Sequence, residues 1–289
     1  METVALTPAA DAAPLVLPAL GLGTWRMGEG SVRRAAEVAA MRRALELGYR
    51  LIDTAEMYGE GGAEEVVGQA LAEAVAAGVV RREDVVVVSK VYPHNASSRG
   101  VQQACDRSRA RLRLDTIDLY LLHWRGNVPL AQTLDGFAAL LDAGHIRRWG
   151  VSNFDVADLQ ELWQHPAGAQ CATNQVWYSA SQRGIEFDLL PWQRERRLPT
   201  MAYSPIDQGT LAAHDGLAAI GRSHGLTAAQ VALAWVLRDG DVIAIPKAVS
   251  EPHLSDNLAA AGATLTDADL AALDRLFPPP RHRQSLAMN

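Results

Sequence analysis

Cysteine, lysine and long hydrophobic runs are scarce in this 289-residue sequence. The two cysteines, Cys105 and Cys171, form no CxxC pair and no ligand cluster, so we expect no structural zinc. No apolar run approaches the ~18 residues that a membrane-spanning helix needs. The start, Met1-Glu2-Thr3, lacks the basic region of a secretory signal. These absences predict a reduced, cytoplasmic protein without a membrane segment.

Concentrated positive charge is also missing. The formal net charge is −6, and no basic block is longer than two or three residues, whereas phosphate binding needs a concentrated basic face. We therefore expect no nucleic-acid partner. The eight histidines are scattered and no HExxH motif occurs, so we also expect no metal site. Hydrophobic residues make up 48% and charged residues 21%, which is ordinary for a globular protein and excludes a disordered chain.

A short apolar run, a polar residue and then a longer helical pattern recur along the chain. The polar ends of these runs are Asp53, Lys90, His123, Asn153, Gln175, Tyr203 and Lys247. Their separation ranges from 22 residues, between Asn153 and Gln175, to 44 residues, between Tyr203 and Lys247. This spacing is typical of βα units with buried parallel strands. Seven units are clear, and an eighth strand near residues 261–265 would complete an α/β (βα)8 TIM barrel, whose usual size is ~250 residues.

The segments between the runs predict amphipathic helices, among them 133–143 and 267–276. No shift in composition marks a linker, so residues 1–289 are interpreted as a single barrel domain. Within it, we expect residues 1–14 to form a loose N-terminal arm. Residues 17–25 suit a small hairpin across the barrel floor.

The placement of the lysines is unusual. Only Lys90 and Lys247 are lysine among the 27 basic residues, and the others are arginine. Both follow an apolar run and neither lies on a polar helix face. Lysine differs from arginine in being a compact point charge whose pKa an environment can move. Drift within an arginine-rich chain is one explanation. The other, which we favour, is that both strand ends face the active site that barrels carry at this end.

In a barrel, the strand ends at Asp53, Lys90 and His123 would meet at one mouth, and Tyr58 lies in the loop just beyond Asp53. A phenol with its ordinary pKa of about 10 is a poor acid near pH 7. A cation such as Lys90 would lower the pKa of Tyr58, and Asp53 would keep Lys90 ionised. Such a phenol can donate a proton to a developing alkoxide. The alternative is a structural Asp53–Lys90 ion pair beside a core histidine.

Eight ordered motifs between residues 15 and 277 resemble those of the aldo-keto reductase family. They are Gly21-Leu22-Gly23-Thr24-Trp25, Leu51-Ile52-Asp53-Thr54-Ala55 with Tyr58-Gly59, Ser89-Lys90, Leu121-Leu122-His123-Trp124, Gly150-Val151-Ser152-Asn153-Phe154, Asn174-Gln175-Val176, Ala202-Tyr203-Ser204-Pro205 and Ile245-Pro246-Lys247. The segments 53–64 and 90–93 are especially similar to those of bacterial methylglyoxal-reductase-type members.

The resemblance implies a TIM barrel that binds a nicotinamide cofactor and transfers hydride to the carbonyl carbon of a small molecule. It implies four catalytic residues, namely Asp53, Tyr58, Lys90 and His123. Among these, Tyr58 would be the proton donor and His123 would orient the carbonyl oxygen. The residues implied at the substrate are Trp25, Tyr58, His123 and Trp124.

The resemblance also implies an extended cofactor site. Ser152, Asn153 and Gln175 would hold the carboxamide, which needs both donors and acceptors. Tyr203 would stack on the nicotinamide ring, and the loop 204–211 would cover the pyrophosphate. The full set implied is Gly23, Thr24, Trp25, Asp53, Ser152, Asn153, Gln175, Tyr203, Ser204, Pro205, Ile206, Gln208, Thr210, Leu211, Ile245, Pro246, Lys247, Ala248, His253, Asp256 and Asn257.

Two residues depart from the family pattern. His253 stands where members that favour NADPH usually carry arginine, and a mostly neutral imidazole would hold the 2′-phosphate less firmly. Asp207 lies in the pyrophosphate loop, where its carboxylate would mildly repel the cofactor. Because Lys247 is present to meet the adenosine phosphate, we favour NADP(H), with NAD(H) as the alternative.

Three functions stay open on the sequence alone. The favoured one is reduction of small aldehydes and ketones, of methylglyoxal type or aromatic, to alcohols. A Schiff-base aldolase using Lys90 or Lys247 is the second, although the chemistry needs a neutral amine and Asp53 would keep Lys90 charged. The third is a regulatory barrel that senses nicotinamide. The oligomeric state is open, with a monomer favoured.

Overall fold

Short apolar runs form eight parallel strands, which pair with one another in chain order. The computed structural model describes residues 2–6 and 15–289. The strands of this sheet are β3 (Leu22–Gly23), β4 (Leu51–Asp53), β5 (Val86–Val91), β6 (Ile117–Leu122), β7 (Ile146–Ser152), β8 (Asn174–Trp177), β9 (Thr200–Tyr203) and β10 (Val242–Ala244). Nearly every side chain in them is buried, as expected of parallel strands that are covered on both faces.

Backbone hydrogen bonds join the first strand of the sheet to the last. The Gly21 N–H donates to the Ala244 carbonyl at 2.8 Å, and the Gly23 N–H donates to the Pro246 carbonyl at 3.0 Å. A Cβ atom at Gly23 would lie only 2.7 Å from the Ile245 carbonyl oxygen, so glycine is needed for this close approach. The sheet is therefore closed, and the predicted (βα)8 barrel is confirmed.

The predicted position of one strand is wrong. Residues 261–265 follow α9 (Glu251–Ala260) and contain no strand, whereas Leu22–Gly23 supplies the missing place in the barrel. A strand of two residues, one of them glycine, is too short for hydrophobic periodicity to reveal.

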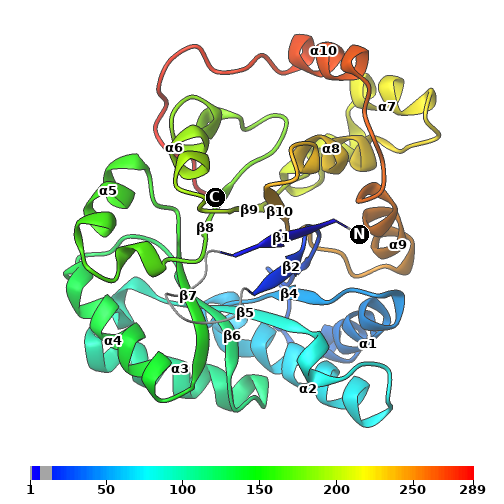
Figure 1. The fold of residues 1–289 in the computed structure, drawn as a ribbon. Helices are drawn as coiled ribbons and strands as arrows, with labels where there is room; N and C mark the ends of the chain where they lie inside the picture. The colour runs from blue at the N-terminus through cyan, green and yellow to red at the C-terminus, as the bar shows by residue number, and fades with distance from the viewer. Residues whose placement is uncertain (1, 7–14) are drawn as a thin grey trace.

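Helices surround the strands in the view of Figure 1. Besides α9 they are α1 (Ser31–Leu47), α2 (Gly62–Ala76), α3 (Ser98–Leu112), α4 (Leu130–Asp142), α5 (Val156–Gln164), α6 (Leu189–Glu195), α7 (Asp215–Arg222), α8 (Ala228–Leu237) and α10 (Asp267–Leu276). The helices predicted at 133–143 and 267–276 correspond to α4 and α10. Short 3-10 turns lie at Tyr58–Gly61, Arg82–Asp84, Pro93–Asn95, Gly168–Gln170, Gly184–Glu186 and Asp207–Ala213. No helix within 2–6 and 15–289 has the length and apolar character needed to cross a bilayer.

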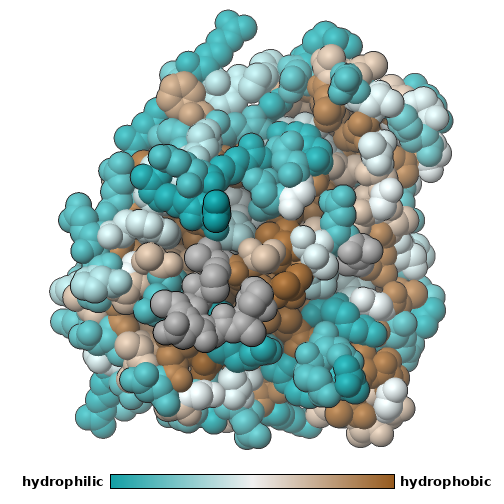
Figure 2. Space-filling view, viewed as in Figure 1, coloured by the Kyte–Doolittle hydropathy of each residue, from teal (hydrophilic) through white to brown (hydrophobic). Residues whose placement is uncertain are grey.

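An antiparallel hairpin precedes the barrel. Its strands are β1 (Thr3–Ala5) and β2 (Val16–Pro18), and Figure 1 shows them lying across the ring of strands. The predicted hairpin is therefore present, but it is not formed by residues 17–25. The prediction of a loose arm over 1–14 is wrong for residues 3–6, which form β1 and the buried Leu6, and residues 1 and 7–14 lie outside the described residues. Figure 2 shows this face, where hydrophilic residues cover much of the helical rim and hydrophobic ones gather nearer the middle.

Polar side chains lie at the carboxyl-terminal ends of the buried strands. Because parallel strands all finish at the same edge of a barrel, their terminal residues converge on one mouth. The residues placed there by the ends of these strands, or by the positions just after them, include Asp53, His123, Ser152, Tyr203 and Lys247. Gln175, within β8, lines the same mouth.

Candidate active site

A cavity of about 730 Å³ opens at this mouth. Its volume lies within the range of ordinary ligand-binding pockets. Three of the four predicted catalytic residues, Asp53, Tyr58 and His123, line it. The fourth, Lys90, lies behind them and is completely buried. The predicted catalytic residues therefore gather at one cavity.

The Lys90 ammonium is the centre of a buried hydrogen-bond cluster. Its Nζ atom lies 2.7 Å from Asp53 Oδ2, 2.9 Å from the Thr54 carbonyl oxygen and 3.2 Å from the Tyr58 hydroxyl. Strand pairing explains this geometry, because Asp53 lies beside Val88 and Lys90 follows Val88 by two residues on the same face. All three protons of the ammonium thus have an acceptor within the protein.

Burial and charge oppose one another at the Tyr58 hydroxyl. Burial raises the pKa of Tyr58 above its ordinary value; Lys90 counteracts this rise, while Asp53 adds to it. Lys90 thus lowers the pKa of Tyr58 in the predicted direction, but burial outweighs it, so the phenol is less acidic than an ordinary one. Burial would by itself lower the pKa of Lys90, but Asp53 and Tyr58 outweigh it, so the pKa is raised and the ammonium stays charged. The site holds a protonated phenol next to a fixed positive charge.

His123 is held neutral at the edge of this cluster. Its side chain is only 7% exposed, and burial together with the charge of Lys90 keeps the pKa of His123 well below its ordinary value. Its ring lies 5.7 Å from the Tyr58 ring, centroid to centroid, in an edge-on arrangement. The Nδ1 atom of His123 is buried without a hydrogen-bond partner in the described part of the chain. A neutral imidazole carries one N–H donor, and because Nδ1 is buried, only Nε2 can offer it to a carbonyl compound in the cavity.

Asn153 links two loops above the strand ends. Its Oδ1 atom accepts a hydrogen bond from the Tyr203 hydroxyl at 2.9 Å, and its Nδ2 atom donates to the His123 carbonyl and to Ser152 Oγ, each at 3.2 Å. Its φ of 58° lies in the left-handed region, which asparagine tolerates better than most residues. The predicted carboxamide residues Ser152 and Asn153 are thus adjacent to the predicted stacking residue, Tyr203.

Gln175 has a contact that the sequence did not indicate. Its Nε2 atom donates to Asp53 Oδ1 at 2.7 Å, while the other carboxylate oxygen of Asp53 binds Lys90. Both oxygens of the buried carboxylate are therefore satisfied, which fixes its orientation toward Lys90.

Aromatic side chains form part of the cavity wall. The Trp124 ring lies 4.9 Å from the His123 ring, and the Tyr92 ring packs edge-on against Trp124 at 6.0 Å. The buried Glu56 carboxylate accepts the backbone N–H of Tyr92 at 2.7 Å and so ties this loop down. On the other side, the Arg26 guanidinium lies 4.4 Å from the centre of the neighbouring Trp25 ring.

Lys247 and His253 also line the cavity, but both are exposed. The Lys247 side chain makes no hydrogen bond or ion pair with any described residue. His253 lies in the first turn of α9, which begins at Glu251 after the extended Ser250. An exposed, unpaired ammonium in a cavity wall is free to bind an anionic group of a ligand.

Comparison with known proteins agrees with this geometry. Residues 19–277 match the model of the Aldo/keto reductase family, which covers most of the chain. The protein is an aldo-keto reductase. The predicted family is therefore confirmed, and with it an oxidoreductase.

Several similar proteins are named as reductases, and some of them have solved structures. Methylglyoxal reductase YeaE of Escherichia coli K12 is 50% identical over 279 residues, which cover 94% of this chain and 95% of that protein. Glyoxal reductase of Bacillus subtilis 168 is 33% identical, covering 90% of this chain and 89% of its own length. An aldo-keto reductase from Klebsiella pneumoniae, solved with NADPH, superposes with a TM-score of 0.92 at 46% identity, covering 100% of both chains.

Most, but not all, predicted site residues of this aldo-keto reductase line the cavity. The exceptions besides Lys90 are Thr210, Leu211 and Ala248, of which Leu211 and Ala248 are buried in the core. The cavity also includes residues that the sequence did not single out, namely Arg26, Met57, Gly209, Ala212, Ala229, Met288 and Asn289. Arg26, Met57 and Gly209 carried a signal that could have been used, because each lies next to or inside a predicted motif.

The loop after β9 has an unusual backbone. Ser204, Asp207 and Gln208 adopt φ values of 48°, 50° and 52°, which are uncommon for residues other than glycine. The Asp207 carboxylate accepts a hydrogen bond from Ser181 at 3.1 Å and does not line the cavity. Because the Asp207 carboxylate is bonded to Ser181 outside the cavity lining, we expect it to repel the cofactor less than its charge alone predicts. No cluster of three or more metal-ligating side chains occurs among the described residues of this reductase.

Proposed function

We propose that this aldo-keto reductase reduces small aldehydes and ketones, of methylglyoxal type or aromatic, to alcohols with NADP(H). The carrying observation is the Tyr58 hydroxyl at 3.2 Å from a buried Lys90 ammonium that Asp53 holds at 2.7 Å. This set combines a proton donor with a charge that stabilises the phenolate left behind. The E. coli relative is named a methylglyoxal reductase, and the K. pneumoniae structures contain NADPH or NADP, which supports the substrate class and favours NADP(H) over NAD(H).

The residues fit a nicotinamide dinucleotide. Lys247 offers an unpaired cation for the adenosine phosphate, with His253 nearby in the first turn of α9. Ser152 and Asn153 offer a hydroxyl and an amide for the carboxamide, and Tyr203 offers an aromatic face. The bound cofactor supplies a hydride to the carbonyl carbon of the substrate.

The protein's own residues complete the reduction. As negative charge develops on the carbonyl oxygen, Tyr58 donates its hydroxyl proton to that oxygen. Lys90 stabilises the resulting phenolate, and Asp53 keeps Lys90 charged and oriented. The neutral His123 would donate a hydrogen bond to the same carbonyl oxygen and orient it between the catalytic groups. Trp25 and Trp124 would exclude water from the reacting carbon.

The aldolase alternative loses support at Lys90. A Schiff base forms from a neutral amine, whereas Asp53 and Tyr58 raise the pKa of Lys90. Trapping with borohydride in the presence of a carbonyl compound tests the remaining candidate nucleophile, Lys247. For a nicotinamide-sensing barrel, the expected signature is a tightly held cofactor with very slow turnover.

The decisive experiment is a panel of carbonyl compounds assayed by loss of NADPH absorbance and then of NADH absorbance. The panel contains methylglyoxal, phenylglyoxal, substituted benzaldehydes and simple ketones. We expect rapid oxidation of NADPH with the dicarbonyls and aromatic aldehydes, and slower oxidation with simple ketones. Absence of turnover with every compound and both cofactors would contradict the proposal.

A further inference from the structure

The chain after α10 crosses the side of the barrel and returns to the cavity. Three prolines, Pro278 to Pro280, prevent the helix from continuing. Figure 1 shows the following segment in red, running past α6 toward β8 and β9. Contacts of residues 283–289 with the start of α6 and with the end of β9 agree with this path. We call residues 283–289 the strap.

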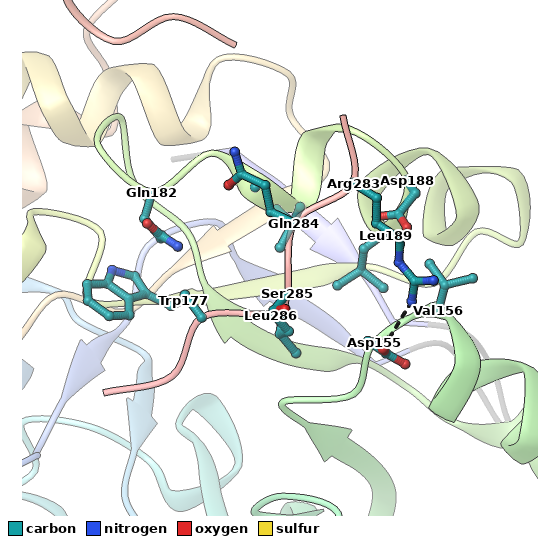
Figure 3. Close-up of a pocket in the computed structure, with 13 residues that line it drawn as sticks. Asp155, Val156, Trp177, Gln182, Asp188, Leu189, Arg283, Gln284, Ser285 and Leu286 are labelled. Carbon is teal, nitrogen blue, oxygen red and sulfur yellow. Dashed lines mark hydrogen bonds and ion pairs between the residues drawn. The ribbon is translucent and has the colours of Figure 1, made fainter. Parts of the chain in front are cut away.

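The strap is attached weakly along its length. Arg283 pairs with Asp155 and with Asp188, each at 3.2 Å, and Figure 3 shows its guanidinium between these carboxylates. All three side chains are at least 31% exposed, and ion pairs so exposed contribute little stability. Leu286 is half-buried against the core, while most of the strap's other residues are exposed. A segment with so few buried contacts can open locally at low cost in free energy.

The tip of the strap bonds to a residue that we assign to the cofactor site. The Nδ2 atom of Asn289 donates to Ser204 Oγ at 2.9 Å. Tyr203, whose hydroxyl proton is directed to Asn153, lines the same cavity as this tip. Met288 and Asn289 both line the cavity. The tip thus binds the Ser204 hydroxyl and takes up space in the cavity where we place the dinucleotide.

We propose that the strap competes with the nicotinamide dinucleotide for the space beside Tyr203 and Ser204 and must be displaced before the cofactor is fully seated. This inference rests on the proposed function, because it takes the cofactor site to include those two residues. Because Met288 and Asn289 line the cavity together with Ser204, a ligand that binds Ser204 from the cavity needs space that the tip takes up. Cofactor affinity is therefore reduced by the stability of the closed strap, and association waits for the strap to open.

The size of the effect follows from the contacts. Releasing one ordinary hydrogen bond changes an equilibrium by about fivefold. We therefore expect the Asn289→Ala variant to bind NADPH about fivefold more tightly than the unmodified protein. A chain shortened after Ala287 should show the same or a larger gain. Arg283→Gln, which loosens the attachment without touching the cavity, should show a smaller gain.

The test is stopped-flow quenching of tryptophan fluorescence by NADPH, with the dissociation constant measured on the same samples. In the unmodified protein, the observed association rate should level off at high NADPH because strap opening limits it. In Asn289→Ala and in the shortened chain, the rate should keep rising with NADPH concentration. His282→Ala is the matched control, since His282 is exposed, neighbours the strap and is not among the residues that line the cavity. Its affinity and rates should equal those of the unmodified protein.

Two results would contradict the proposed competition between strap and cofactor while leaving the proposed function intact. Weaker binding or faster NADPH release in the shortened chain would mean that the tip retains the cofactor. Equal affinity and equal rates in all variants would mean that the tip does not occupy the cofactor's position. If neither the unmodified protein nor any variant binds NADPH or NADH, the proposed function fails, and the strap proposal fails with it.

Discussion

The two lysines of this chain occupy contrasting environments in one cavity. Lys90 is fully buried, and its ammonium is surrounded by Asp53, Thr54 and Tyr58. Lys247 is exposed, and its side chain has no partner among the described residues. Both follow or belong to strands whose ends meet at the barrel mouth. The same side chain thus serves inside the protein as a fixed charge and at the surface as a binding group for a ligand.

The contrast explains why arginine, common elsewhere in the chain, is absent from position 90. The space around Lys90 accommodates a compact ammonium with three hydrogen bonds, and a planar guanidinium would not fit a fully packed site. No such packing constrains Lys247, so its identity reflects the ligand more than the fold.

The largest expected effect comes from removing the group that Lys90 serves. Tyr58→Phe deletes the hydroxyl while keeping both lysines and the ring contact with His123. We expect kcat to fall by about 10²- to 10⁴-fold, the usual contribution of a general acid. Cofactor affinity, measured by fluorescence titration with NADPH, should change little. A variant that retains full kcat would refute the role of Tyr58 as proton donor.

The same substitution at each lysine should separate their roles in stability. Lys90→Met leaves the buried Asp53 carboxylate without its partner, and such losses typically cost about 3–5 kcal/mol. Lys247→Met removes an exposed side chain and should change the free energy of unfolding by less than about 0.5 kcal/mol. Urea unfolding of both variants measures the difference. Equal stabilities would mean that the buried pair contributes no more than a surface residue.

Replacing Lys247 should change the affinity for NADPH relative to NADH, and not the stability of the fold. Lys247→Ala removes the cation that we assign to the 2′-phosphate, and a hydrogen bond to a charged group is worth about 1.5–3 kcal/mol. We therefore expect NADPH to bind about 10- to 100-fold more weakly, with a much smaller loss for NADH. Titration with the two cofactors measures both constants. Equal losses for NADPH and NADH would refute the phosphate role, and Lys247→Arg is the control that should retain the preference.

Local sequence patterns predicted the strands whose ends carry chemistry, because each is a distinct apolar run followed by a polar residue. They could not reveal β3, since Leu22–Gly23 is too short for any periodicity. The hairpin was assigned to the wrong residues because β1 and β2 are distant in sequence and pair only in the folded chain. The position of Asn289 was equally hidden, because it depends on long-range contacts of Arg283 and Ser204.

The pKa of Tyr58 shows a second property that the sequence did not predict. The sequence indicated the right neighbour, because the strand register brings Lys90 to the phenol. It did not indicate how deeply the hydroxyl is buried, and burial outweighs the effect of the charge. Sequence spacing therefore gives contacts between groups more readily than the balance between desolvation and charge.

The smallest expected effect concerns His123, which lies close enough to Lys90 for the ammonium to influence it. Burial, aided by Lys90, keeps the pKa of His123 well below the value of about 6.5 expected in the unfolded chain. Below pH 6.5 the unfolded state therefore binds more protons than the folded state, so stability falls as the pH falls. Between pH 7.5 and pH 5.5 this group should cost about 1.4 kcal/mol of the free energy of unfolding.

His123→Gln isolates that contribution, because glutamine keeps a hydrogen-bonding side chain but does not titrate. Urea unfolding at both pH values should show a smaller loss of stability in the variant than in the unmodified protein, by about 1.4 kcal/mol. The other titrating groups are common to both proteins and cancel in the difference. An identical pH dependence would mean that His123 is protonated as readily in the folded protein as in the unfolded chain. In that case the charge of Lys90 would not extend its influence beyond Asp53 and Tyr58, and the division between a buried and a ligand-facing lysine would be less sharp than the geometry indicates.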